Sequence, residues 1–325
     1  MNIALTNKCN RRCEFCFQKE WFLESPEHPL QEMPMEMFKD IVAHFRFREC
    51  QIFGGEPFLY SKLDELGRFC LEKDLKITLL TNLSVEPAIV KNFFEKYGKI
   101  VKGALVNSDY HPHQENDFIA NCQYLEENKF KFALGTTFLP DSDRVEENIS
   151  RMTTILKKVD YDQLNFIRIS TMTPKHEGKF KQFDYSQIVG KYIEALLKIN
   201  PKLRFGFDCV PAACEISPDF WAHYHHVLQD KNYKICTPIL DFMTDGSVIW
   251  CSSAKFFTVP DYKKFNTLEE LKTELLRQRQ AYWRRYNLAI GCRECINFGA
   301  DTCGGLCAAK NEAIRLAQEQ EDGGK

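Results

Sequence analysis

Apolar residues recur along the first two thirds of the chain with two alternating periods. Segments whose apolar residues stand three or four positions apart predict helices, and short apolar runs bounded by glycine, proline or polar residues predict strands. Residues 34–47, "PMEMFKDIVAHFRF", show the helical spacing, whereas residues 50–57, "CQIFGGEP", form an apolar run that two glycines and a proline end. The predicted strands are 2–6, 50–57, 76–82, 100–108, 130–139, 164–171 and 203–209. The predicted helices are 34–47, 63–74, 87–98, 114–128, 145–158 and 186–199.

This regular exchange of strands and helices predicts the α/β class, with a parallel sheet and crossover helices arranged as a partial (βα)6 TIM-like barrel. In such sheets the functional residues lie on loops at the carboxyl ends of the strands. The first predicted strand leads into a cysteine-rich loop, and the second leads into Gly54, Gly55 and Glu56. We therefore expect these two loops to meet at one edge of the sheet.

The pattern changes after about residue 210. The chain becomes rich in loops, with a predicted hairpin "ILDFMTDGSVIWC" that turns at Asp245-Gly246, a predicted helix at 267–286 and a cysteine-dense run "GCRECINFGADTCGGLC". This predicts a small C-terminal domain that metal holds together more than an apolar core does. The expected division is a core domain at 1–210, a cysteine-rich domain at 211–316 and a disordered tail at 317–325.

The composition limits the kinds of binding partner and the cellular compartment that we expect. The chain has 325 residues, is 44% hydrophobic and carries a formal net charge of −2, so no strong electrostatic field indicates nucleic acid or a membrane surface. No apolar run approaches the roughly 18–20 residues of a membrane span, and no signal peptide is recognisable, which together predict a cytoplasmic protein. The 14 cysteines are clustered, which in a reducing compartment indicates metal ligands more than disulfides.

The first cluster is "NKCNRRCEFCFQ", in which Cys9, Cys13 and Cys16 have the spacing C-x3-C-x2-C. Three thiolates can hold a [4Fe–4S] cluster and leave one iron without a protein ligand, as a catalytic metal centre requires. The alternative is a zinc site that His111, His113 or another cysteine completes. Cys50, Cys70 and Cys122 lie within strand or helix patterns and are expected in the core.

With Phe15 before its third cysteine, this loop resembles the signature of the radical S-adenosylmethionine (radical SAM) superfamily, and "GGEP" at 54–57 resembles that family's second motif. The resemblance covers residues 1–210. It implies a cluster that binds S-adenosylmethionine (SAM) and cleaves it reductively to methionine and a 5′-deoxyadenosyl radical. Gly54 and Gly55 would let backbone carbonyls reach the SAM ammonium, Glu56 would add a negative acceptor there, and Phe15 would lie near adenine.

Two further site predictions follow from the same resemblance. After the fourth strand, relatives supply a serine to SAM, and here Asn107 takes that place with Ser108 beside it. Arg168 on the sixth strand is expected to pair with the SAM carboxylate, unless it forms only a surface salt bridge.

The last third of the chain resembles the SPASM extension of radical SAM enzymes, which implies one or two auxiliary [4Fe–4S] clusters. The matching residues form a C-x9-G-x4-C pattern through Cys236, Gly246 and Cys251. They continue as C-x2-C-x7-C-x3-C through Cys292, Cys295, Cys303 and Cys307. The family pattern has five residues where this chain has seven between Cys295 and Cys303. It also ends with a further cysteine, and none follows Cys307 here.

The resemblance leaves the ligand sets open. It implies one cluster on Cys236, Cys251 and Cys307, with Cys209 or Cys214 as a possible fourth ligand, and a second on Cys292, Cys295 and Cys303. A rival partition joins Cys209, Cys214, Cys236 and Cys251 and leaves the four-cysteine run as the other site. A single auxiliary cluster and a structural zinc are the remaining alternatives.

SPASM-type enzymes mostly modify peptides or proteins, so the resemblance implies a peptide or protein substrate and an electron donor such as flavodoxin or ferredoxin. The alternatives are a small-molecule dehydrogenase or lyase on the same scaffold and a non-catalytic iron–sulfur electron carrier. Ser252 stands where the sulfatase-maturing branch has its aspartate base. His111, His113 and Asp208 are the candidate replacements for that base.

Overall fold

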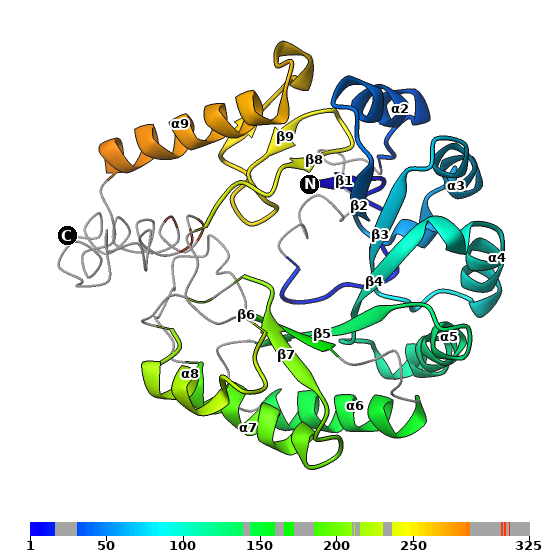
Figure 1. The fold of residues 1–325 in the computed structure, drawn as a ribbon, viewed down its shortest axis with the longest axis vertical. Coiled ribbons are helices and arrows are strands. Elements are labelled where there is room, and N and C mark those ends of the chain that lie inside the picture. The colour runs from blue at the N-terminus through cyan, green and yellow to red at the C-terminus, as the bar shows by residue number, and fades with distance from the viewer. Residues whose placement is uncertain are drawn as a thin grey trace.

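The structure, a computed structural model, describes residues 1–16, 31–138, 144–159, 166–171, 185–209, 211, 215–229, 236–286, 307, 309 and 312. Within them a ten-stranded sheet has the order β10-β9-β8-β1-β2-β3-β4-β5-β6-β7. Figure 1 shows the strands curving into an incomplete ring with helices on its outer side. The predicted α/β class and partial barrel are confirmed.

The parallel part of the sheet follows the sequence order, with each strand beside the next. Its strands are β1 (Asn2–Ala4), β2 (Glu49–Phe53), β3 (Lys76–Thr81), β4 (Val101–Asn107), β5 (Phe132–Phe138), β6 (Phe166–Thr171) and β7 (Arg204–Phe207). All of these pairs are parallel, so their carboxyl ends share one edge, as predicted.

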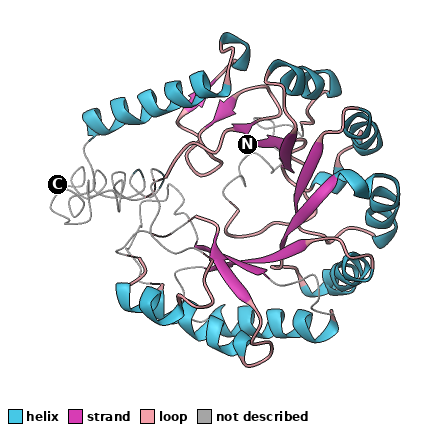
Figure 2. Cartoon of the chain, viewed as in Figure 1, coloured by secondary structure: helices cyan, strands magenta, loops and turns pink. Residues whose placement is uncertain are grey.

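The helices that connect these strands cover the outer face of the sheet, as Figure 2 shows. They are α2 (Met35–His44), α3 (Leu63–Glu72), α4 (Pro87–Tyr97), α5 (Glu115–Glu127), α6 (Arg144–Lys158) and α7 (Ser186–Leu197). One helix that the sequence analysis missed is α8 (Pro218–Tyr224), which begins after Ser217, whose Oγ accepts from Phe220 N at 3.2 Å. Among the described residues, no helix has both the length and the apolar character that crossing a bilayer requires.

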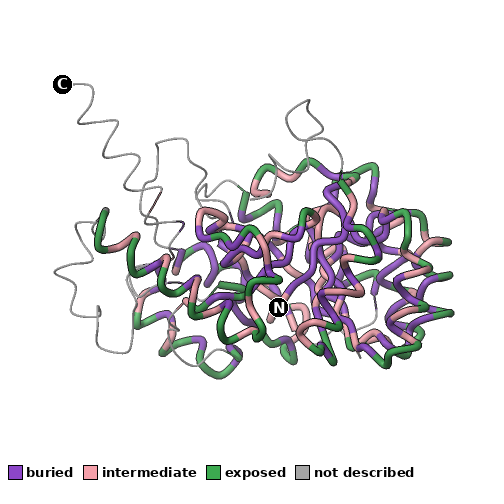
Figure 3. Tube along the Cα trace, turned by 90° about the horizontal axis from the view of Figure 1, so that it is seen from above, coloured by how far each residue is buried: buried purple, intermediate pink, exposed green. Residues whose placement is uncertain are grey.

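The strands direct alternate side chains to the two faces of the sheet. In β6, Ile167 and Ile169 are buried in the main core between sheet and helices. Arg168 and Ser170 therefore lie on the inner face of the ring. Figure 3 shows the buried residues gathered through the interior of the described chain, with exposed residues at its outer turns.

The predicted hairpin forms and extends the same sheet. β8 (Asp241–Phe242) and β9 (Val248–Ile249) are antiparallel, and the turn between them places Gly246 at φ +85°. β10 (Thr258–Val259) continues on the β9 side, and β8 pairs with β1 in parallel. The predicted helix is also present as α9 (Leu268–Tyr286), whereas the tail at 317–325 lies outside the described residues.

A buried carboxyl group joins the hairpin to the first strand. Asp241 accepts hydrogen bonds from Asn2 Nδ2 at 2.8 Å and from Ser252 Oγ at 2.7 Å. Because it is buried and its partners are neutral, the pKa of Asp241 rises to about 6. A folded-state pKa above the unfolded value favours folding only while the group is protonated. The contribution of Asp241 to stability is therefore present below pH 4 and is lost as the pH rises through 6.

We predict that Asp241→Asn raises the melting temperature at pH 8 and has little effect at pH 4. The gain is up to about 3 kcal/mol, since one pKa unit corresponds to about 1.4 kcal/mol. Thermal unfolding of both proteins across this pH range measures it. The matched control is Asp219→Asn, the same change of carboxyl to amide at an exposed position in α8. A loss of stability in Asp241→Asn at pH 8 would contradict the burial argument.

Candidate active site

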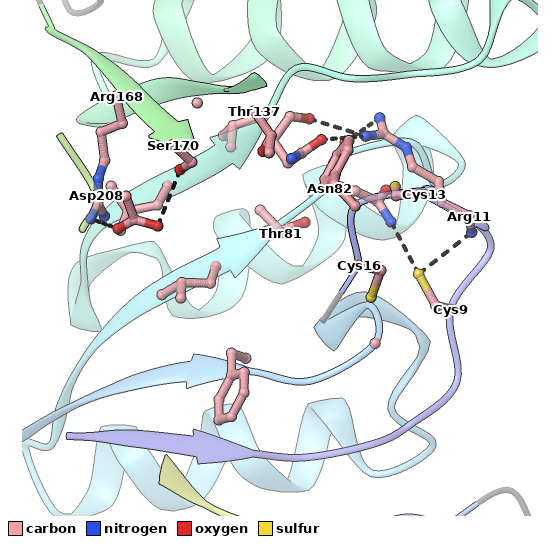
Figure 4. Close-up of a pocket in the computed structure, with 18 of the residues that line it drawn as sticks. Cys9, Arg11, Cys13, Cys16, Thr81, Asn82, Thr137, Arg168, Ser170 and Asp208 are labelled. Atoms are coloured by element: carbon pink, nitrogen blue, oxygen red, sulfur yellow. Dashed lines mark hydrogen bonds and ion pairs between the residues drawn. The ribbon is translucent and has the colours of Figure 1, made fainter. Parts of the chain in front are cut away.

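A cavity of about 290 Å³ lies at the carboxyl edge of the parallel strands. Figure 4 shows side chains from the cysteine loop and from β3, β5, β6 and the end of β7 that line it. The predicted site residues among its lining are Cys9, Cys13, Phe15, Cys16, Gly54, Gly55, Asn107, Arg168, Asp208 and Cys209. The structure thus brings together most of the residues that the two motifs and the strand ends had suggested.

The glycine pair holds the cysteine loop against the end of β2. Gly55 N donates to Thr6 O at 2.7 Å, and Glu56 N donates to Lys8 O at 2.7 Å. A Cβ atom on Gly55 would stand 2.0 Å from Lys8 O, and Gly54 has φ +143°. Glycine is therefore required at these positions because two backbone segments of the protein approach closely there. The sequence analysis did not predict this contact.

Glu56 does not line the cavity, and its expected role as a direct acceptor for SAM is revised. Its carboxylate is fully buried and accepts from Thr81 Oγ1 at 2.7 Å and from Asn82 N at 2.7 Å. It also accepts from Phe58 N at 3.2 Å. Burial raises the pKa of Glu56. Through these hydrogen bonds Glu56 connects the ends of β2 and β3 beneath the cysteine loop.

Arg11 anchors the cysteine loop from inside. It is 3% exposed, and its Nη1 donates to the backbone oxygen and the Oδ1 of Asn107, both at 3.1 Å. Its Nη2 donates to Asn82 O at 2.8 Å and to Ser84 Oγ. No sequence pattern distinguishes Arg11 from its exposed neighbour Arg12, so the burial of Arg11 was not predicted.

The thiols of this loop have a polar but shielded environment. Cys9 Sγ accepts from Arg11 N at 3.4 Å and lies 3.8 Å from Asn82 Nδ2. Burial raises the pKa of Cys9 and raises that of Cys13 to about 12, so both are neutral thiols near pH 7 when they bind no metal. Ligation replaces the thiol protons with metal. The partly buried sulfurs and the fixed guanidinium of Arg11 suit an anionic iron–sulfur group.

The structure separates the two candidates that follow β4. Asn107 lines the cavity, whereas Ser108 is 2% exposed and its Oγ donates to Gly135 O at 2.8 Å. Asn107 Nδ2 donates to Asp109 Oδ2 at 3.2 Å, and Arg151 pairs with the other oxygen of Asp109 at 3.1 Å. Asn107 is therefore held by a network that continues away from the cavity into the protein.

The wall of the cavity opposite the cysteines is polar. Arg168 forms an ion pair with Asp208, and Ser170 Oγ donates to the same carboxylate at 3.3 Å. His111 and His113 do not line the cavity; their rings stack at 5.7 Å between centroids on an exposed turn. Of the three candidate bases, Asp208 is the one that lies in the cavity.

The other cysteines fall into three sets, apart from Cys209, which is exposed and lines the cavity. Cys50, Cys70 and Cys122 are buried in the core, as expected. Cys236, Cys251 and Cys307 are partly buried and pack against the main core. Cys214, Cys292, Cys295 and Cys303 lie outside the described residues. Their roles stay predictions.

Comparison with known proteins gives a family match. Residues 3–105 match the family model of the Radical SAM superfamily. The S-adenosylmethionine-dependent nucleotide dehydratase RSAD2 of Siniperca chuatsi is 29% identical over 128 residues, which are 38% of this chain and 34% of that protein. The antilisterial bacteriocin subtilosin biosynthesis protein AlbA of Bacillus subtilis is 27% identical over 132 residues, 38% of this chain and 28% of that protein.

The fold extends the likeness over nearly the whole chain. Streptococcus suis SuiB bound to S-adenosylmethionine superimposes with a TM-score of 0.63 at 15% identity, over 95% of this chain and 72% of SuiB. SuiB bound to its precursor peptide SuiA gives a TM-score of 0.53 at 17% identity, over 77% of this chain and 58% of SuiB. The chain spans about a third of the length of the two curated relatives named above, and its fold is that of SuiB. Residues 3–105, which contain the three-cysteine loop held against Gly54 and Gly55, are thus similar to the Radical SAM superfamily.

Proposed function

We propose that this protein cleaves S-adenosylmethionine reductively and uses the 5′-deoxyadenosyl radical to remove hydrogen from a peptide or protein. The observation that carries the proposal is the shared cavity, in which three thiols, two backbone glycines and a polar far wall face one another. Cys9, Cys13 and Cys16 would hold a [4Fe–4S] cluster, which when bound supplies one electron and an open iron to SAM.

The remaining residues of the cavity fit SAM by charge and shape. The backbone of Gly54 and Gly55 offers carbonyl oxygens toward an ammonium group, and Phe15 offers an apolar surface for adenine. The guanidinium of Arg168 suits a carboxylate, and Asp208 holds that guanidinium in place. Glu56 and Arg11 act indirectly, by keeping the cysteine loop in position.

The choice of a peptide substrate rests on similarity. AlbA is named for the biosynthesis of a bacteriocin, and SuiB has been crystallised with a precursor peptide. A nucleotide is the second candidate, because RSAD2 is named a nucleotide dehydratase. We also propose that the C-terminal part of the chain is a SPASM-like domain with auxiliary clusters. The electron donor would be a flavodoxin or a ferredoxin.

The test is an anaerobic assay of the protein after reconstitution with iron and sulfide. With dithionite and SAM, the proposal expects 5′-deoxyadenosine. Peptides encoded beside this chain's coding region should increase the yield of 5′-deoxyadenosine and should transfer a hydrogen atom to it. A nucleotide pool should do neither. Zinc without iron at Cys9, Cys13 and Cys16, with no 5′-deoxyadenosine, would overturn the proposal. Stimulation by a nucleotide alone would select the second candidate.

We predict that Cys13→Ala abolishes formation of 5′-deoxyadenosine and removes one cluster's worth of iron, because the cluster loses one of its three thiolates. Circular dichroism should show an intact fold, since Cys13 lines a cavity and is not part of the core. Cys70→Ala is the matched control: it removes a thiol from the core and should leave the product yield near the wild-type value. Persistent product in Cys13→Ala would contradict the assignment.

Gly55→Ala is predicted to destabilise the protein by about 1–3 kcal/mol, as overpacking typically does, and to impair cluster loading. The added methyl group must push the cysteine loop away from β2, because it would overlap Lys8 O. Gly135→Ala provides the comparison, since its Cβ would meet Val106 O at an ordinary 3.6 Å in the same cavity. Thermal unfolding and iron content measure both variants. Equal behaviour of the two would refute the close-approach argument.

Arg11→Leu should cost about 3 kcal/mol, because several buried acceptors lose their donor at once. It should also lower the iron bound at the N-terminal loop. Arg12→Leu changes the adjacent exposed residue and should remain within about 0.5 kcal/mol of wild type. Denaturant titration and iron analysis distinguish the two positions. If Arg12→Leu were the more damaging change, the anchoring role of Arg11 would be wrong.

A further inference from the structure

A buried carboxylate outside the cavity holds one of the residues that line it. Asp109 follows β4, and its side chain is 8% exposed. Its Oδ2 accepts from Asn107 Nδ2 at 3.2 Å and from Thr137 N at 3.3 Å, and its Oδ1 accepts from Arg151 Nη1 at 3.1 Å. Asn107 and Thr137 line the cavity, whereas Asp109 and Arg151 do not. Any effect of Asp109 on a molecule in the cavity must therefore pass through its neighbours.

The hydrogen bonds of the Asn107 amide allow it only one orientation. Its Oδ1 accepts from Arg11 Nη1 at 3.1 Å and from Asp109 N at 3.0 Å, while its Nδ2 donates to the carboxylate of Asp109. A guanidinium and a backbone amide can only donate, and an ionised carboxylate can only accept. A half-turn of the Asn107 amide would therefore place donor against donor and oxygen against oxygen.

This orientation determines what Asn107 can offer to a molecule in the cavity. The oxygen of a side-chain amide has two lone pairs, and its nitrogen has two hydrogens. Both lone pairs of Asn107 accept hydrogen bonds within the protein, and one of the hydrogens goes to Asp109. With respect to the described residues, the group that remains is one N–H. Asn107 can therefore donate to a bound molecule but cannot accept from it.

Arg151 holds Asp109 from α6 and is itself held there. Its Nη2 forms an ion pair with Glu147, one turn earlier on the helix, and its guanidinium lies 5.7 Å from the ring centroid of Tyr110. Burial raises the pKa of Asp109 to about 6, and the charge of Arg151 acts in the opposite direction. Asp109 is therefore ionised at pH 8, in the form that accepts from Asn107, Thr137 and Arg151 together.

We propose that Asp109 is a positioning residue, which Arg151 fixes from α6 and which holds the Asn107 amide so that it donates to an oxygen atom of SAM. The inference rests on the proposed function only in naming SAM as the molecule in the cavity. SAM carries acceptor oxygens in its carboxylate and in its ribose, so a single N–H has a partner in either position. Helix α6 thereby contributes to SAM binding through a side chain that does not line the cavity.

The first test measures the dissociation constant of SAM for the reconstituted, oxidised protein at pH 8, where no electron is available to cleave SAM. Asp109→Asn should raise this constant about five- to tenfold, because the Asn107 amide loses the anion that orients it and so about one hydrogen bond to SAM. In the Asn107→Ala protein, adding Asp109→Asn should change the constant less than about twofold, because the effect is transmitted by Asn107. Equal losses in the two backgrounds would overturn the inference.

Variants of α6 separate positioning from a general loss of stability. Arg151→Leu should raise the dissociation constant in the same way as Asp109→Asn, and Arg151→Lys should restore part of the affinity because it keeps the positive charge. Lys157→Ala changes an exposed residue of the same helix and should leave the constant at the wild-type value. Thermal unfolding of each variant is measured beside its affinity. Full SAM affinity in Arg151→Leu would contradict the role of α6.

The second test needs neither a cluster nor SAM. In metal-free protein with isotopically labelled asparagine, nuclear magnetic resonance reads the side-chain amide of Asn107, whose signal is identified by its loss in Asn107→Ala. Its hydrogens should exchange with solvent about tenfold faster in Asp109→Asn than in the wild-type protein. Equal exchange rates would overturn the inference. A wild-type protein that binds no SAM would overturn the proposed function, whereas these rates would still decide whether Asp109 positions Asn107.

Discussion

The site depends on the contact between two backbones at the ends of β1 and β2. The amides of Gly55 and Glu56 donate to the carbonyls of Thr6 and Lys8, and this is possible only where no Cβ atom intervenes. The cysteine loop begins at the next residue, so its position is set by main-chain hydrogen bonds from the neighbouring strand. A loop fixed in this way presents its thiols to the cavity before any metal binds, which reduces the ordering cost of ligation.

Two buried charges of opposite sign support this contact. Glu56 lies beneath the loop and Arg11 lies within it, and each offsets part of the other's burial cost. Each charged side chain also has neutral hydrogen-bond partners. Glu56 accepts from backbone amides and Thr81, and Arg11 donates to carbonyls, Asn107 and Ser84. Buried charges are tolerable when hydrogen bonds satisfy most of their polar atoms, and of the side-chain nitrogens of Arg11 only Nε has no partner among the described residues. The arrangement couples the cysteine loop to β3 and β4 as well as to β2, so a disturbance at any of these strand ends reaches the thiols.

The sequence reveals those features that follow from periodicity and spacing. The parallel order of the strands predicted that the cysteine and glycine loops would meet at one edge of the sheet. The sequence does not show the orientation of a single side chain in a loop. Arg11 and Arg12 are chemically identical neighbours, and only the packing of the loop on Asn82 and Asn107 decides which one is buried. Glu56 was misjudged for the same reason: its motif placed it at the cavity, but its carboxylate turns toward β3.

The incomplete ring gives the C-terminal part of the chain a structural role. β8 continues the sheet from β1, so the hairpin and the cysteine loop are carried by adjacent strands. At the other end of the sheet, the segment at Leu228 bridges to Phe205 and covers part of the exposed edge of β7. No strand of the described residues joins β7 to the hairpin. A closed barrel gains rigidity from continuous hydrogen bonding, whereas an open one must be held by side chains or by ligands across its gap. Cys209 follows β7 by two residues, and Cys236 and Cys251 flank the hairpin, so among the described residues cysteines stand at both sides of that gap.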